Sequence, residues 1–190
     1  MKTLLHIASL IDALNERVGR TVYWLILVIV LISSGNALMR KLFNVSSNAF
    51  LEIQWTLFAA VFLLAAGYTL KHNEHVRIDV VTGRFGKRVQ AWIDIIGGTL
   101  FLLPMALIIL YFSWPSFVLS FKSMEHSGNP GGLLLWPAKL LIPAGFLLLL
   151  LQSLAETIKR IGFLLGIAPP EAPLPEDKAP CQKNEVQDVR

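Results

Sequence analysis

The sequence predicts an all-α integral membrane protein with four transmembrane helices, a short N-terminal amphipathic helix and both termini in the cytoplasm. Composition is the first reason, because 54% of the 190 residues are hydrophobic and 16% are charged. Soluble globular domains have about 45–50% apolar and about 25% charged residues. The mean hydropathy of +0.58 points the same way. The other two reasons are four long apolar runs and an uneven distribution of lysine and arginine.

Each apolar run is long enough to cross a bilayer, whose core is about 30 Å thick and takes about 20 helical residues. We expect a membrane domain over residues 21–160, with spans at 21–39, 50–70, 91–119 and 133–155. The third run is longer than a crossing requires, and Pro104 is expected to kink it because proline removes a backbone donor. Trp114-Pro115 is expected to mark the exit of this run into the membrane interface, where tryptophan is enriched.

Lysine and arginine gather in segments that would share one side of the membrane. Thirteen of the 17 basic residues fall in the N-terminal segment, in the connection between spans two and three, and in the C-terminal tail. The opposite side has Arg40, Lys41, Lys122 and Lys139. Positively charged loops stay in the cytoplasm, so both termini are expected inside the cell.

A cleaved signal peptide is the alternative interpretation of the first apolar run. Signal peptides have a short basic start, an apolar stretch of about 7–15 residues and a small-residue cleavage site. Here a long mixed segment precedes the run, and Ser34-Gly35-Asn36-Ala37 is a poor cleavage signature. The sequence therefore favours a retained helix.

Residues 1–20 are predicted to form an interfacial amphipathic helix on the cytoplasmic side. Apolar side chains recur at helical spacing from Leu4 to Val18, whereas Asp12 and Glu16 lie largely on the other face. This pattern fits a helix in the headgroup layer, before the chain turns into the membrane. A frayed soluble lead-in is the alternative.

The connection between spans two and three is similar in character, with apolar positions suited to lipid and basic ones to phosphate headgroups. It contains His75, Arg77 and Asp79, and Asp79 is expected to cap a short helix that begins at Val80. Residues 168–190 are rich in proline and charge, which predicts a disordered cytoplasmic tail.

Polar residues near the opposite ends of the spans are the candidate functional residues, because ionisable groups in a membrane are costly. Arg40 ends the first span and Glu52 begins the second, while Lys139 lies about 9 Å into the fourth by the helical rise. Asn36 is four residues before Arg40, so the two share a helix face.

Three interpretations of Arg40, Glu52 and Lys139 are open. The first is a partly buried ion-pair cluster that fixes the helices or contacts another subunit. The second is that the two cations extend to the lipid headgroups. The third is a site for an anionic substrate, although transport sites usually lie near the midplane on broken helices and internal repeats.

Enzymatic, metal and cofactor chemistry is not expected. The histidines fall outside the apolar cores, which argues against a haem held inside the helices, and His72 and His75 lack further metal ligands nearby. Cys181 is the single cysteine, so neither a disulfide nor a metal pattern is present. No phosphate loop, nucleophile elbow or pair of catalytic carboxylates is recognised. The basic residues form no stripe for nucleic acid, whereas membrane lipids are expected partners.

Several short segments together resemble the small permease subunit of tripartite ATP-independent periplasmic (TRAP) transporters, the DctQ-like family. The resemblance covers roughly residues 20–165. One departure is Leu51, where many members have a second acidic residue beside the glutamate. The segments that carry the resemblance are Asn36 with Arg40, Phe43-Asn44, Glu52, Ala65-Ala66-Gly67, NEHVRIDVV at 73–81 and GGLLLWPAKLLIPAGFLLLLLQSLAETIKRIG at 131–162.

The resemblance implies a specific role in the bacterial inner membrane. In this family a periplasmic receptor captures a solute, often an organic acid, and a large permease subunit carries it inward on an ion gradient, commonly of sodium. The small subunit binds the large one as a membrane scaffold. Asn36, Arg40, Glu52 and Lys139 would then stabilise the bundle or its contact with the large subunit.

A self-contained four-helix protein, such as a small homodimeric transporter, is the rival hypothesis. A neighbouring reading frame for a large permease of about a dozen spans, together with a secreted solute receptor, would favour the scaffold. A membrane enzyme would need a catalytic cluster that the sequence lacks.

Overall fold

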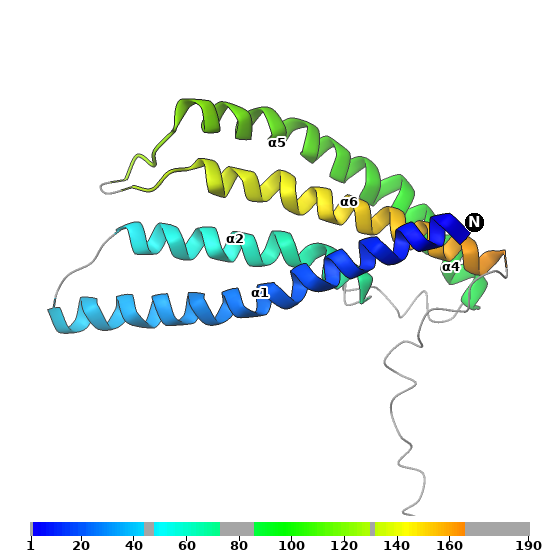
Figure 1. The fold of residues 1–190 in the computed structure, drawn as a ribbon, viewed down its shortest axis with the longest axis horizontal. Helices are drawn as coiled ribbons and strands as arrows, with labels where there is room; N and C mark the ends of the chain where they lie inside the picture. Colours follow the sequence, from blue (N-terminus) through cyan, green and yellow to red (C-terminus); the bar gives the residue numbers. More distant parts are fainter. Residues whose placement is uncertain (1, 44–47, 73–85, 130–131, 166–190) are drawn as a thin grey trace, which may run out of the picture.

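The computed structural model describes residues 2–43, 48–72, 86–129 and 132–165, and the regular elements of this part of the chain are all helices (Figure 1). Four rods are long and apolar enough to cross a membrane, which confirms the predicted all-α membrane fold. The third rod combines three consecutive elements over Val89–Ser123. The elements are α1 (Lys2–Phe43), α2 (Asn48–Lys71), α4 (Lys87–Gly97), the π-helical turn η1 (Gly98–Leu102), α5 (Leu103–Ser123) and α6 (Trp136–Leu164).

Helix α1 is one continuous helix, whereas the sequence predicted a separate amphipathic helix followed by a turn into the membrane. Its 42 residues span about 63 Å at the helical rise, twice the thickness of a bilayer core. No proline interrupts the segment, and extending an existing helix adds one hydrogen bond for each residue fixed. Leu4, Ile7 and Leu14 are exposed, whereas Asp12 and Asn15 hydrogen-bond to Gln152 of α6.

The third rod changes its hydrogen-bond pattern where the sequence predicted a kink. Pro104 stands in the first turn of α5 and cannot donate to the carbonyl of Leu100. The chain adopts a π-helical turn immediately before it, in which the backbone N–H of Leu103 donates to the carbonyl of Gly98. Such turns interrupt regular helices at prolines and glycines.

The sequence predicts that the third rod enters the membrane interface at Trp114-Pro115, and the helix itself does not end there. Helix α5 continues through Pro115 and ends at Ser123, followed by Met124 in a left-handed conformation. An apolar solvent offers no partners for an unwound backbone, so a helix with one missing bond is more stable there than an early end. The fourth rod begins at Trp136 rather than at 133, with Pro137 in its first turn, where a missing N–H costs nothing.

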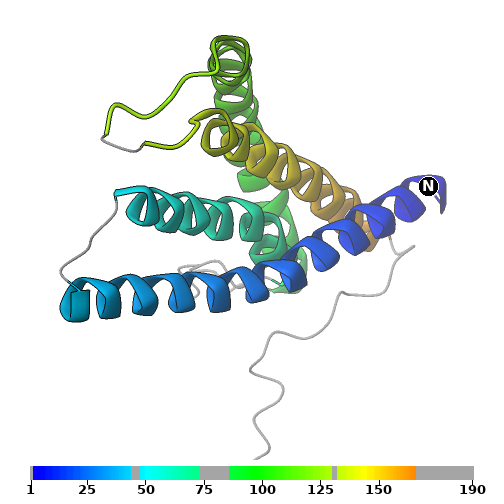
Figure 2. The ribbon, with the colours of Figure 1, turned by 60° about the vertical axis from the view of Figure 1, so that its left-hand side comes forward.

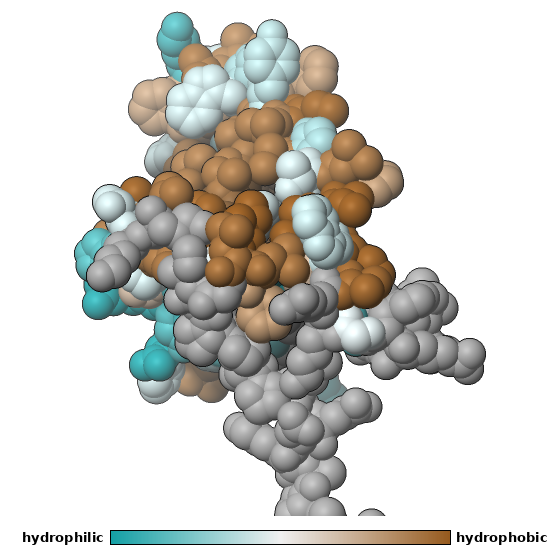
Figure 3. Space-filling view, turned by 90° about the vertical axis from the view of Figure 1, so that its right-hand side faces the viewer, coloured by the Kyte–Doolittle hydropathy of each residue, from teal (hydrophilic) through white to brown (hydrophobic). Residues whose placement is uncertain are grey.

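Helix α6 is the central element of the bundle. It packs against α1, α2 and α5 and also contacts α4 and η1 (Figure 1). Helix α5 lies beside α6 and away from α1 in both ribbon views (Figure 2). We call the end where α1 begins and α6 ends the terminal end, and the other the opposite end. From the terminal end, most of the drawn surface is hydrophobic and the hydrophilic residues gather toward one side (Figure 3).

Close approach between the central helices depends on glycines. A Cβ atom on Gly145 of α6 would lie 2.8 Å from the carbonyl oxygen of Leu63 in α2. A Cβ atom on Gly19 of α1 would lie 2.3 Å from the ring of Tyr68. In lipid, where apolar burial does not drive association, small residues let helices approach and gain packing contacts.

Substituting Gly145 tests this packing. Gly145→Ala should lower the thermal unfolding midpoint of the purified protein in detergent, because the added methyl group meets backbone atoms of Leu63 that cannot move aside. Overpacking of this kind costs about 1–3 kcal/mol. Gly35→Ala is the matched control, because a Cβ atom there meets nothing within 4 Å and alanine favours the helix. Equal midpoints for the two variants would contradict the close contact.

Candidate functional site

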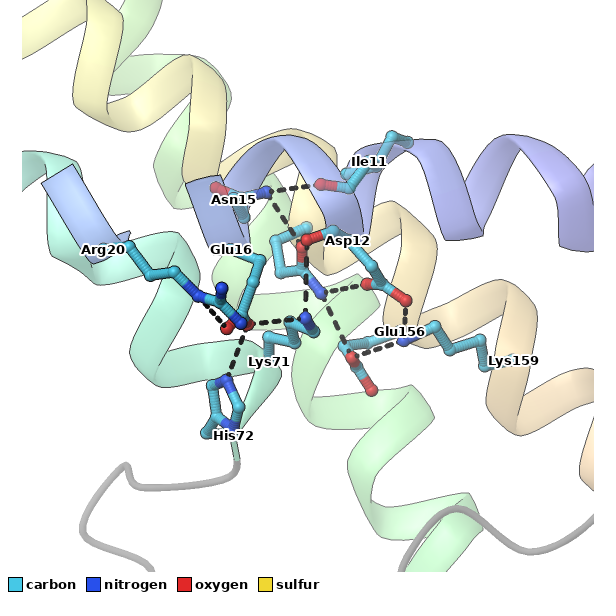
Figure 4. A network of polar contacts seen from close by, with 10 residues as sticks. Ile11, Asp12, Asn15, Glu16, Arg20, Lys71, His72, Glu156 and Lys159 are labelled. Carbon is cyan, nitrogen blue, oxygen red and sulfur yellow. Dashed lines mark hydrogen bonds and ion pairs between the residues drawn. The ribbon is translucent and has the colours of Figure 1, made fainter. Parts of the chain in front are cut away.

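Polar side chains form two groups, one at each end of the bundle. The group at the terminal end, which we call the terminal network, joins α1, α2 and α6 (Figure 4). Its members are Asp12, Asn15, Glu16, Arg20, Lys71, His72, Gln152, Glu156 and Lys159.

Gln152 of α6 is the centre of the terminal network and is completely buried. Its carbonyl oxygen accepts a hydrogen bond from Asn15 Nδ2 at 2.8 Å. Its amide nitrogen donates to Asp12 Oδ1 at 2.8 Å and to Glu156 Oε1 at 3.2 Å. One amide therefore connects α1 to α6 through both of its polar atoms, which a hydrophobic residue of the same size would not do.

Ion pairs extend the terminal network on both sides of Gln152. Lys159 Nζ lies 2.6 Å from Asp12 Oδ2 and 3.1 Å from Glu156 Oε1. Lys71 Nζ lies 2.8 Å from Glu16 Oε2 and connects α2 to α1. Charged groups taken out of water are tolerated when they are paired and hydrogen-bonded, as these acids and lysines are.

The remaining contacts of Glu16 lie at the surface of the network. His72 Nε2 is 3.0 Å from Glu16 Oε2, and the His72 ring stacks at a tilt on Tyr68 with centroids 4.3 Å apart. Arg20 Nε is 3.1 Å from Glu16 Oε1, one turn along α1. Such exposed pairs contribute little to stability.

Asn15 also contacts the backbone of α2. A Cβ atom on Gly67 would lie 2.3 Å from Asn15 Oδ1, so that oxygen occupies the space that any larger residue would need. Asn15 Oδ1 is itself buried and has no hydrogen-bond partner among the described residues. Gly67 therefore permits α1, α2 and α6 to meet around Asn15 and Gln152.

A separate ion pair ties the third rod to α6 at this end. Arg160 Nη1 lies 2.5 Å from Asp94 Oδ2 of α4, and both side chains are mostly buried. The pair holds the start of the third rod against the C-terminal part of α6, just before the rod passes through η1.

Glu52 holds the loop between α5 and α6 at the opposite end. Its carboxylate accepts hydrogen bonds from the hydroxyl of Ser127, from Asn129 Nδ2 at 2.7 Å and from the backbone N–H of Leu133 at 2.9 Å. The loop also pairs with itself, through a bridge between His126 and Leu134. Carboxylates bind N–H and O–H donors strongly, so Glu52 fixes the loop to the start of α2.

Lys139 holds the same loop from α6. Its ammonium lies 2.5 Å from Glu125 Oε2, and the Ser120 hydroxyl donates to the same oxygen at 2.9 Å. These hydrogen bonds, that of Lys139 above all, hold the pKa of the Glu125 carboxyl below its ordinary value, although partial desolvation opposes them.

The structure does not bring the predicted residues of the opposite end into one cluster. Glu52 is bound by neutral donors and Lys139 by Glu125, so the two belong to adjacent contacts on the same loop. Arg40 is exposed at the end of α1, and Asn36 is half-buried one turn before it. Neither has an ion pair or side-chain hydrogen bond in the described part of the chain.

The predicted loop residues His75, Arg77 and Asp79 and the predicted tail 168–190 lie outside the described residues.

The sequence did not identify the terminal network or Glu125. A signal was present: Asp12 with Glu16, and Gln152 with Glu156, are each four residues apart and so share a helix face. Recognising that these faces meet required knowledge of which helices are neighbours. Among the described residues, no group of three or more histidine, cysteine or acidic side chains is arranged to hold a metal ion.

Comparison with known proteins identifies the family of the chain. A family model matches residues 29–162, and its description is Tripartite ATP-independent periplasmic transporters, DctQ component. The chain belongs to the DctQ family. The match extends over all four rods of the bundle and confirms the resemblance on which the sequence prediction rested. Neither the curated proteins nor the solved structures include a match to this chain.

Membership in the DctQ family fixes the broad class of the protein. It is a component of a transporter and a multi-pass protein of the inner membrane, and the family is not a family of enzymes.

Replacing Gln152 tests the terminal network. Gln152→Leu should lower the free energy of unfolding by about 1–3 kcal/mol, because Asn15 and Asp12 would keep buried polar atoms without their partner. Unfolding is measured by circular dichroism while the protein is titrated with a denaturing detergent. Arg20→Gln is the control, since its side chain is 75% exposed and its pair should contribute little. If the Gln152→Leu protein were as stable as the control, Gln152 would not stabilise the fold through the terminal network.

The ion pair between Lys139 and Glu125 predicts a dependence on pH. Because folding lowers the pKa of Glu125, the pair stabilises the fold above the ordinary glutamate value of 4.5, and this stabilisation is lost as the pH falls through the lowered pKa. The effect should be modest, since the Glu125 side chain is 44% exposed. Thermal midpoints measured from neutral pH downward should fall less steeply in Glu125→Gln than in the natural sequence. If the thermal midpoint fell with pH equally steeply in both proteins, the pair would not stabilise the fold.

Proposed function

We propose that the chain is the small membrane subunit of a TRAP transporter and binds the large permease subunit as a fixed scaffold. The large subunit would carry a solute, an organic acid, inward on an ion gradient after a periplasmic receptor delivers it. The match of the DctQ family model over residues 29–162 is the observation that supports this proposal.

The position of the polar residues favours a scaffold over a solute carrier. The charges of the terminal network pair with one another, and Glu52 and Lys139 bind the loop between α5 and α6. A carrier site for an anion usually lies near the midplane, on broken helices that offer unpaired donors. Here the polar contacts lie at the two ends of the bundle and hold helices to each other.

The proposed orientation places the terminal end in the cytoplasm. Thirteen of the 17 lysines and arginines belong to the N-terminal segment, the connection between the second and third spans, and the C-terminal tail, and such basic segments remain on the cytoplasmic side of membrane proteins. The loop held by Glu52 would then face the periplasm and the receptor. Arg40 and Asn36, on the same side, are candidates for contacts with the large subunit or with headgroups.

The first half of α1 would lie at the cytoplasmic surface of the membrane. Its exposed leucine and isoleucine side chains fit the boundary between headgroups and acyl chains, while Asp12 and Asn15 hold it to α6. The connection with His75, Arg77 and Asp79 would follow the same surface.

Co-purification tests the proposed function directly. The tagged full chain, expressed with the large permease subunit from the neighbouring reading frame, should retain that subunit in detergent. Solute uptake by cells should require both subunits and the receptor. Recovery of the chain as a homodimer that transports by itself would instead support a stand-alone transporter.

Glu52→Gln tests the part played by the opposite end. Glutamine has one acceptor oxygen in place of two, and its amide nitrogen would oppose either the backbone N–H of Leu133 or the donors of Ser127 and Asn129. The loop should lose its fixed position, and retention of the large subunit or uptake should fall several-fold. Gln54→Glu is the control and changes the charge in the opposite direction. Gln54 lies two residues further along α2 and is not among the loop contacts. Normal assembly and uptake by Glu52→Gln would remove this role.

A further inference from the structure

A hollow of about 590 Å³ lies between α5 and α6 in the apolar part of the bundle. Helix α5 packs mainly on α6, so the hollow opens on the side of α5 that no other described helix covers. We call it the α5–α6 groove. Its lining includes Leu107, Tyr111, Trp114 and Pro115 of α5 and Pro143 and Leu147 of α6.

The α5–α6 groove lies deep in the membrane. Tyr111 precedes Lys122 by eleven residues on one helix, which is about 16 Å at the helical rise. Lys122, Glu125 and Lys139 mark the polar boundary at the opposite end. Because the hydrocarbon core is about 30 Å thick, Tyr111 lies close to its middle. Tyrosine is normally found at the membrane interfaces, where its hydroxyl reaches water.

Tyr111 presents a polar group that the chain itself does not satisfy. Its side chain is 73% exposed, and its hydroxyl has no hydrogen bond within the described residues. Acyl chains cannot supply a partner, and an unsatisfied polar group in hydrocarbon is costly.

Two prolines add backbone acceptors beside the same groove. Pro115 and Pro143 lie inside α5 and α6 and lack an N–H group. The carbonyls four residues earlier, those of Tyr111 and Lys139, therefore lose their regular helical donors. In membranes such carbonyls are satisfied by hydroxyl or amide side chains of neighbouring helices.

We propose that the α5–α6 groove binds a transmembrane helix of the large permease subunit, and that this helix has a hydroxyl or amide side chain at the depth of Tyr111. The proposal rests on the proposed function and adds the face and the depth of the contact. A polypeptide with donors and acceptors satisfies the hydroxyl and the backbone carbonyl of Tyr111, whereas lipid tails fill the apolar volume and leave both unpaired.

Photocrosslinking in the complete complex tests which face is used. The crosslinking residue p-benzoylphenylalanine replaces Tyr111 in one variant and Phe62 in the control. Phe62 is 76% exposed on α2 and lies ten residues, about 15 Å, below Glu52, so the two positions are matched in depth. Position 111 should crosslink to the large subunit, and position 62 should not.

The opposite results overturn the proposal in distinguishable ways. Crosslinking to the large subunit from 62 and not from 111 would refute the face while the proposed function stands. Crosslinking from 111 to a second copy of this chain, or to lipid alone in a complex that still co-purifies, would refute the occupant. Failure of the unmodified chain to co-purify with the large subunit would refute the proposed function as well.

Tyr111→Phe tests the hydrogen bond separately from the fold. The hydroxyl has no partner within the described chain, so the thermal midpoint of the isolated protein should not change. Binding of the large subunit in detergent should weaken roughly three- to ten-fold, the range for side-chain hydrogen bonds between membrane helices. Phe112→Leu, at an adjacent exposed position, is the control and should bind normally. Unchanged binding by Tyr111→Phe would refute the polar contact.

Discussion

The arrangement of this bundle depends on the buried amide of Gln152. Hydrophobic burial does not hold helices together in lipid, so their association needs close packing and polar contacts between helices. Gln152 supplies these contacts to Asn15 and Asp12, and Asn15 in turn packs on Gly67 of α2. Three helices are therefore fixed at one point.

The two ends of the bundle are held by different chemistry. The terminal network pairs acids with lysines on neighbouring helices, which holds these helices together. At the opposite end, Glu52 and Lys139 hold one loop from two sides, through hydrogen bonds and an ion pair. The bundle is thus fixed at both ends, while the α5–α6 groove between them remains open to a partner.

Much of the fold could be predicted from the sequence, because its main determinant is the length of apolar runs. Four such runs separated by polar connections give four helices, and the structure confirms them. The continuity of α1 and the extension of α5 to Ser123 were not predicted, since both depend on how costly it is to end a helix in or near lipid.

The polar contacts were predicted less well, for a physical reason. Glu52 and Lys139 were recognisable as costly ionisable groups near the ends of spans, but their partners were not, and those of Glu52 lie far away in sequence. Glu52 binds a loop some eighty residues later, and Asp12 binds Gln152 across 140 residues. Helical spacing shows which residues share a face, and it does not show which faces meet.

A fixed scaffold should keep its shape while the transporter works, and a distance measurement tests this most directly. Spin labels on cysteines introduced at Ser34 of α1 and Ser116 of α5, with Cys181 replaced by serine, report the separation of the two outer rods. In the purified complex, pulsed electron–electron double resonance should give one narrow distance distribution. Adding solute, coupling ion and receptor should not change this distribution. A second distance that appears with solute and ion would contradict a scaffold and assign this chain to the moving part.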